Sequence, residues 1–173
     1  MKTLVKLCAI FTIGCSIVFS SFPAPAAVAK PEADDPSEAV LSPTTRHELM
    51  LARKATAKYG DISQALADGY ADINVFIPNM GFHYLKLSEL DGQFDPERPE
   101  LLVYAQDLCE RQMRLVAVEY AVPTSLTATA PEGFTGDADH WHRQDNFGLW
   151  TLHAWIWFRN PDGVFAELNP RVP

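Results

Sequence analysis

The sequence predicts an α+β domain in which an N-terminal helical segment packs on a curved antiparallel sheet of about five or six strands. Three observations predict it. Helical spacing of apolar residues is confined to residues 45–69, strand-like segments follow from residue 70 onward, and two of these segments are joined by a short loop typical of a hairpin. A small β-barrel or sandwich with one helix is the alternative.

Residues 1–29 have the composition of a secretory signal peptide. Lys2 and Lys6 precede an apolar run over residues 7–19, and small residues up to Ala29 provide a cleavage site. The run is shorter than the about 20 residues that a membrane-spanning helix needs. We therefore predict an exported protein, periplasmic or secreted, with no membrane span. A lipid anchor at Cys15 is the alternative, although the usual leucine is missing three residues before that cysteine.

Residues 30–43 predict a flexible leader rich in proline, alanine and acidic side chains, and residues 44–173 predict a single globular domain. Hydrophobic residues make up 47% of the chain, which is too many for a disordered protein. Outside the signal only Cys109 remains. The domain therefore has no internal disulfide and must be stabilised by its core.

The charge balance narrows the classes of partner. The chain has 14 basic and 22 acidic residues, and removal of Lys2 and Lys6 with the signal leaves 12 basic residues against the same 22 acidic ones. An acidic protein repels phosphate backbones and anionic lipid headgroups, which argues against nucleic acid or a membrane surface as partner. A negative net charge is compatible with the binding of metal ions, but the need to keep the protein soluble is by itself a sufficient reason for it. The oligomeric state is left open.

The helical segment is expected to begin in a capping box. Thr45 has the side chain of a helix cap, and Glu48 stands three residues later, where it can reach the cap amide. Apolar residues follow at helical spacing until Gly60. Asp61 then begins a second, shorter helix that ends at Gly69.

Four segments after residue 70 have the residue types of strands. Residues 73–77 are β-branched and aromatic and end at Pro78, and residues 82–87 follow a turn. Residues 101–106 and 111–122 predict the clearest hairpin of the chain.

The aromatic run at residues 150–160 predicts a central strand. Both sets of its alternate positions are largely apolar, as in a strand that is covered on both faces. The run ends at the turn Asn160-Pro-Asp-Gly163. Residues 124–148 before it predict a long polar loop, a feature that is uncommon in compact domains and often functional.

Ionisable side chains stand at the centres of these apolar segments. His83, Glu119 and His153 each lie in the middle of one, and a buried carboxylate must be paired, protonated or bound to a metal. His142, two residues after His140, lies in the long loop. Imidazoles with one carboxylate suit a divalent transition metal such as Zn, Fe, Cu or Mn. We therefore predict a pocket for a metal or small ligand at His83, Glu119, His153 and His142.

Tyr84 and Trp155 stand close to the strand histidines in sequence and are expected at the wall of this pocket. Whether the domain is an enzyme stays open; in an enzymatic version the metal activates water or dioxygen and Glu119 acts as base. The rival hypothesis is a non-enzymatic structural or interaction module whose buried His and Glu groups form a hydrogen-bond network. Glu119 paired with an arginine, Arg114 or Arg159, belongs to that hypothesis. No spacing in the sequence defines a metal class.

Five motifs span the domain: Met80-Gly-Phe-His-Tyr84, Asp95-Pro-Glu-Arg-Pro-Glu100 with Leu-Leu-Val-Tyr104 after it, Leu115-Val-Ala-Val-Glu-Tyr120, Leu152-His-Ala-Trp-Ile-Trp157 and Asn160-Pro-Asp-Gly-Val-Phe165. Together they resemble a family of uncharacterised small exported bacterial proteins, over about residues 55–170. The resemblance implies that His83, Glu119 and His153 act as a unit. It implies no activity, cofactor or fold, and it does not extend to His140 or His142.

Overall fold

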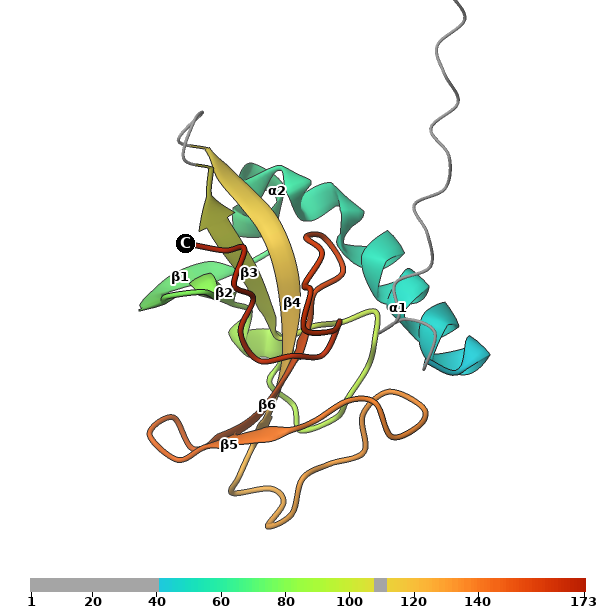
Figure 1. Cartoon of the computed structure of the whole chain (residues 1–173). Coiled ribbons are helices and arrows are strands. Elements are labelled where there is room, and N and C mark those ends of the chain that lie inside the picture. Colours follow the sequence, from blue (N-terminus) through green and yellow to red (C-terminus); the bar gives the residue numbers. More distant parts are fainter. Residues whose placement is uncertain (1–40, 108–111) are drawn as a thin grey trace, which may run out of the picture. The chain divides into compact units, whose positions relative to one another are not determined.

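The structure is a computed structural model that describes residues 41–107 and 112–173, all within one compact unit (Figure 1). The signal, most of the leader and Cys109 lie outside the described residues, so our predictions for them stay predictions. None of the helices in the described ranges is long and apolar enough to cross a membrane.

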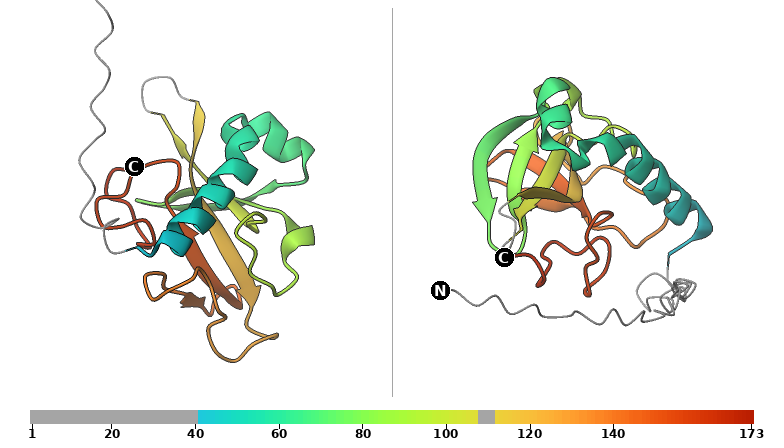
Figure 2. Two further views of the ribbon diagram at one scale, coloured as in Figure 1. Left: turned by 90° about the vertical axis from the view of Figure 1, so that its right-hand side faces the viewer. Right: turned by 90° about the horizontal axis from the view of Figure 1, so that it is seen from above.

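The predicted fold class is confirmed. A helical segment packs against a curved antiparallel sheet of six strands that forms a half-barrel (Figure 2). Every neighbouring pair of strands is antiparallel. In order across the sheet the strands are β1 (Ala71–Ile77), β2 (Gly81–Leu85), β3 (Leu101–Gln106), β4 (Met113–Pro123), β6 (Leu149–Ala154) and β5 (His142–Gln144).

The helical segment consists of α1 (Pro43–Thr56), a 3-10 turn η2 (Ala57–Gly60) and α2 (Ile62–Ala67). The predicted second, shorter helix is confirmed, and Asp61 caps it by accepting the amide of Ser63 at 2.9 Å. A short 3-10 turn, η3 (Leu87–Glu89), follows β2.

The predicted capping box at Thr45 and Glu48 is wrong. Ser42 is the cap of α1, and its hydroxyl accepts the amide of Thr45 at 3.0 Å. Thr45 is buried in the first turn and donates its hydroxyl to the carbonyl of Thr135. Glu48 accepts the amide of Thr135 at 2.8 Å and its hydroxyl at 2.6 Å. Both side chains therefore fasten the helix to a distant loop, which local spacing does not reveal.

Residues 150–160 do not form one central strand. The middle positions of the sheet belong to β3 and β4, and β6 ends at Ala154. The amides of Trp157 and Phe158 donate instead to the carbonyl of Val116, at 3.2 and 3.0 Å. Val116 lies where the register between β3 and β4 shifts, and such a bulge leaves a backbone group free for another partner. The chain therefore leaves the sheet after Ala154.

The long loop before β6 also differs from the prediction, because residues 142–144 within it form β5 at the edge of the sheet. The predicted turn at the end of the aromatic run is confirmed. The amide of Gly163 donates to the carbonyl of Asn160 at 3.2 Å, and Gly163 has a φ of 113°.

The two faces of the sheet have different roles. Tyr84, Leu102, Val118 and Ala154 are aligned across four strands and belong to the main core, which also contains buried residues of α1, η2 and α2. Side chains alternate between the faces along a strand, so the residues next to these point the other way. The opposite face thus receives His83, Glu119 and His153.

Candidate metal centre

Three strands contribute the ionisable side chains of the opposite face. Glu119 of β4 is paired directly with His153 of β6, whereas His83 of β2 is paired with Val103 of β3. One strand therefore lies between His83 and Glu119, and neighbouring strands are about 4.8 Å apart. The side chains of His83 and Glu119 can therefore meet only if the face of the sheet between them is curved, so that they lean toward each other.

The side chains do converge. Nε2 of His83 lies 3.5 Å from Oε2 of Glu119, and Nε2 of His153 lies 3.4 Å from Oε1 of the same carboxyl. One ligand atom from each residue lies within 4.8 Å of the other two, and all three residues are buried. This cluster of His83, Glu119 and His153, called the triad below, could hold a metal ion.

Burial sets the protonation of the triad. It raises the pKa of the Glu119 carboxyl, and the nearby His83 and Thr151 oppose that shift. Burial also lowers the pKa of His153 to about 4. At neutral pH His153 is therefore uncharged, which is the form of imidazole that binds metals.

The hydrogen bonding of the two histidines differs. Nδ1 of His83 lies 3.2 Å from the carbonyl oxygen of Val75, which fixes the ring and leaves Nε2 facing Glu119. Metal-binding histidines are commonly oriented through their other ring nitrogen in this way. Neither ring nitrogen of His153 has a hydrogen-bond partner among the described residues. Buried polar atoms without a partner are rare in native proteins, and an ion or a water molecule bound beside them would satisfy them.

An apolar cavity of about 80 Å³ is lined by the triad. Ile73, Val75 and Ile77 of β1 line it, and so do Phe147 and Leu149 on and before β6. Ile73 and Phe147 are partly exposed, at 37% and 58%, so the cavity has an apolar rim that reaches the solvent. A ligand bound at the triad would lie in a largely apolar environment.

Two of the other predicted site residues lie elsewhere. His142 is on the edge strand β5, with Nδ1 3.7 Å from Oε2 of Glu167, and is not part of the triad. Tyr84 points into the main core, where its ring makes an edge contact with Tyr104 at 5.1 Å. The prediction of Tyr84 at the pocket wall is therefore wrong, because it is adjacent to His83 on one strand and must face the other way.

Trp155 contacts the triad from the side. Its ring stacks on that of His153 with the centroids 6.5 Å apart, and its indole nitrogen donates to the carbonyl of Ala166 at 2.6 Å. It is not among the residues that line the cavity. Arg114 lies over the ring of Phe158 and does not pair with Glu119.

Sequence reasoning missed Met80. Its thioether sulfur lies 3.2 Å from Nε2 of His83, and the residue is only 3% exposed. Met80 occupies the turn between β1 and β2, where the two-residue alternation of strands does not apply. The signal in the sequence is its place at the end of the turn over residues 78–80, three residues before His83.

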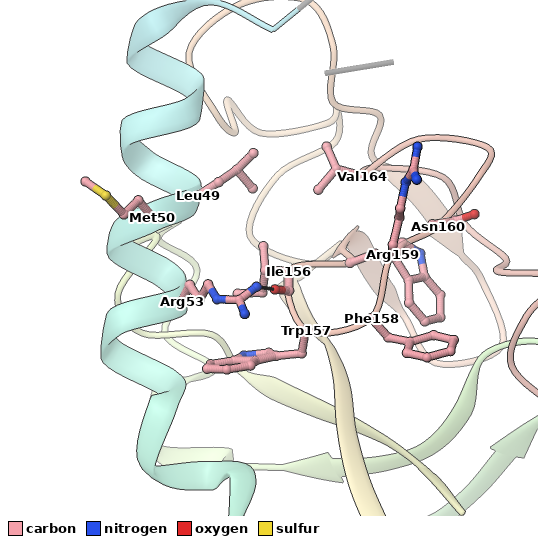
Figure 3. Close-up of a pocket in the computed structure, with 10 residues that line it drawn as sticks. Leu49, Met50, Arg53, Ile156, Trp157, Phe158, Arg159, Asn160 and Val164 are labelled. Atoms are coloured by element: carbon pink, nitrogen blue, oxygen red, sulfur yellow. Dashed lines mark hydrogen bonds between the residues drawn. The ribbon is translucent and has the colours of Figure 1, made fainter. Parts of the chain in front are cut away.

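A second cavity, of about 310 Å³, lies between α1 and residues 155–164 (Figure 3). The guanidinium of Arg53 stacks over Trp157 at 4.5 Å and donates to the carbonyl of Ile156. The indole of Trp157 donates to Thr56 at 3.0 Å. These polar groups hold α1 against the segment that follows β6, and none of the described residues that line this cavity is a histidine or a carboxylate.

Comparison with family models, with curated proteins and with solved structures found no match to this chain. The resemblance of the five motifs to a family therefore stays a prediction, and the triad is the feature of this chain that bears on function.

Proposed function

We propose that the domain binds a single transition-metal ion through Nε2 of His83, the carboxylate of Glu119 and Nε2 of His153. The observation that carries this proposal is the state of His153. Its ring is buried and uncharged, has no hydrogen-bond partner within residues 41–107 and 112–173, and faces a carboxyl oxygen at 3.4 Å. A metal ion between the two groups would satisfy both.

The rival hydrogen-bond network is less well supported. In such a network each buried ring nitrogen has a partner, and leaving one unsatisfied costs about 1–3 kcal/mol. Both ring nitrogens of His153 are without a partner among the described residues. A bound cation removes the cost at Nε2 and compensates the charge of an ionised Glu119, whose burial otherwise favours the acid form.

The ligand set restricts the metal. Two imidazoles and one carboxylate suit Zn, Fe, Cu or Mn and are a poor match for Ca or Mg, which prefer oxygen ligands only. Three protein ligands also leave coordination positions for water or a small molecule. The adjoining cavity, lined by apolar side chains such as Val75 and Leu149, favours a small uncharged one.

Metal titration tests the proposal. Chelator-treated protein is titrated with Zn²⁺ by calorimetry, and the wild type is expected to bind one equivalent. His153→Gln is expected to weaken binding at least about tenfold, since each lost ligand interaction exceeds about 1.4 kcal/mol. His142→Gln is the matched control, because that histidine lies outside the triad, and it should bind as the wild type does. Substoichiometric binding by the wild type, or equal affinity in His153→Gln, contradicts the proposal.

We also propose that the domain is exported after cleavage behind Ala29, on the basis of the lysines and the apolar run at its start. Mass spectrometry of the protein from its native host gives the test. A mature chain that begins at Lys30 with a free amine supports the proposal. A lipid on Cys15, or an uncleaved chain, contradicts it.

A further inference from the structure

We propose that the thioether of Met80 is a fourth ligand of the same ion and makes the centre selective for copper. The inference rests on the proposed metal site, since it assigns the identity of the ion that the triad binds.

The distances match those between atoms that share one ion. Atoms bound at about 2.0–2.3 Å from a metal lie roughly 3–4 Å from one another. Sδ of Met80 lies 3.2 Å from Nε2 of His83, close to the 3.5 and 3.4 Å that join the two imidazoles to Glu119. The sulfur therefore has the separation from Nε2 of His83 that two ligands of one ion would have.

The orientation of His83 turns one ring nitrogen toward both Met80 and Glu119. Nδ1 of His83 lies 3.2 Å from the carbonyl oxygen of Val75, and Nε2 on the other side of the ring lies 3.2 Å from Sδ of Met80 and 3.5 Å from Oε2 of Glu119. Met80, His83, Glu119 and His153 all line the same cavity. An ion bound there by the triad would therefore have the thioether beside it.

The backbone fixes Met80 at this place. Its amide donates to the carbonyl of Ile77 at 3.0 Å, and Asn79 and Gly81 on either side have positive φ angles of 62° and 122°. The amide of Asn79 is bound in turn by the carbonyl of Pro173 at 3.1 Å. The thioether is thus held by a defined turn, as preorganised metal sites require.

The chemistry of sulfur gives the selectivity. A thioether is a soft, uncharged ligand that binds Cu(I), whereas Zn, Fe and Mn gain little from it beside imidazole and carboxylate. Met80 also packs with Val103, Ala117 and Trp155, so the alternative role is packing alone. Leucine fills a similar volume without the sulfur, which separates the two roles.

The experiment compares two metals and three proteins. Chelator-treated wild type, Met80→Leu and the control Met50→Leu, whose methionine is 58% exposed on α1, are titrated with Cu(I) against a chromogenic chelator and with Zn²⁺. Met80→Leu is expected to weaken Cu(I) binding at least about tenfold, or about 1.4 kcal/mol, and to leave Zn²⁺ binding within about threefold. Met50→Leu should change neither.

The outcomes separate this inference from the proposed function. If Met80→Leu binds both metals as the wild type does, or loses both equally, Met80 is no selective ligand and the inference is overturned while the metal site stands. If the wild type binds neither metal, the metal site itself is wrong. X-ray absorption of Cu(I)-loaded protein labelled with selenomethionine needs no variant: a selenium neighbour at bonding distance supports the inference, and nitrogen and oxygen neighbours alone overturn it.

Discussion

Glu119 and His153 face each other across adjacent antiparallel strands, with Oε1 of the carboxyl 3.4 Å from Nε2 of the imidazole. Burial favours the neutral form of each group, since it raises the pKa of Glu119 and lowers that of His153 to about 4. The metal-free protein therefore avoids a buried charge at this pair. Binding of a cation requires Glu119 to ionise, which couples metal binding to proton release.

Glu119→Gln is expected to abolish metal binding without destabilising the metal-free protein. Because burial raises the pKa of Glu119, its acid form stabilises the fold at low pH, and this contribution is lost as pH rises through the raised value. Glutamine keeps the uncharged state at every pH. Urea unfolding with chelator present should show the variant at least as stable as wild type at pH 5 and more stable at pH 8. A variant that is less stable at pH 8 contradicts this account.

Glu100→Gln is expected to remove part of the pH dependence of stability. Burial raises the pKa of Glu100 to about 8, although its carboxyl accepts the amide of Ala121 at 3.0 Å. The pKa of glutamate in an unfolded chain is about 4.3, so between this pH and about 8 the folded state holds a proton that the unfolded state has lost. Stability therefore falls as pH rises through this window.

Urea unfolding at pH 5 and pH 8.5 measures the effect of Glu100→Gln. The wild type should lose at least about 2 kcal/mol more than the variant over this interval, because each unit of pKa difference corresponds to about 1.4 kcal/mol. Glu97→Gln is the control, because Glu97 is exposed and lies three residues earlier in the chain. The stability of this variant should change with pH as that of the wild type does. Parallel pH profiles for wild type and Glu100→Gln would show that Glu100 is ionised in the fold.

Gly81→Ala is expected to destabilise the domain by roughly 2–4 kcal/mol, in the range of strained backbone positions and steric overlap. Gly81 has a φ of 122°, and a Cβ there would lie 2.4 Å from the carbonyl oxygen of Tyr104. Gly60→Ala is the control, because nothing lies within 4 Å of its Cβ position. Unfolding by urea gives both values. Equal stability of the two variants would show that the backbone at the start of β2 can relax.

Ser42→Ala is expected to cost about 1 kcal/mol, the usual effect of removing a helix cap. Its hydroxyl accepts the amide of Thr45 at 3.0 Å at the first turn of α1. Thr44→Ala changes an exposed neighbour that is not the cap and should have a smaller effect. Thermal unfolding of both variants shows which residue caps the helix, and a larger loss for Thr44→Ala would contradict the assignment.

The spacing of apolar residues predicted the helices and strands, because in each of them the buried face follows from residues that are close together in sequence. The helical stripe that includes Leu49 and Ala52 is buried, and the hairpin of β3 and β4 forms where apolar residues alternate. The end of β6 could not be predicted in this way. It depends on the carbonyl of Val116, which lies far away in sequence and accepts the amides of Trp157 and Phe158.

The candidate site could be predicted in part, because alternate residues of a strand point to opposite faces of the sheet. His83, Glu119 and His153 stand out as ionisable groups in apolar strands, and the structure brings them together. Tyr84 could have been excluded by the same rule, since it is adjacent to His83. Met80 could not be assigned, because its direction depends on the positive φ angles of a turn.

The separation of His83 from Glu119 by a strand has a consequence for the sheet as a whole. An ion held by β2, β4 and β6 would act as a non-covalent cross-link through the middle of the half-barrel. Flattening of the sheet would pull its ligands apart, so the ion would oppose every opening motion of these strands and slow amide exchange in them. By thermodynamic linkage, any partner that widens the half-barrel would release the ion.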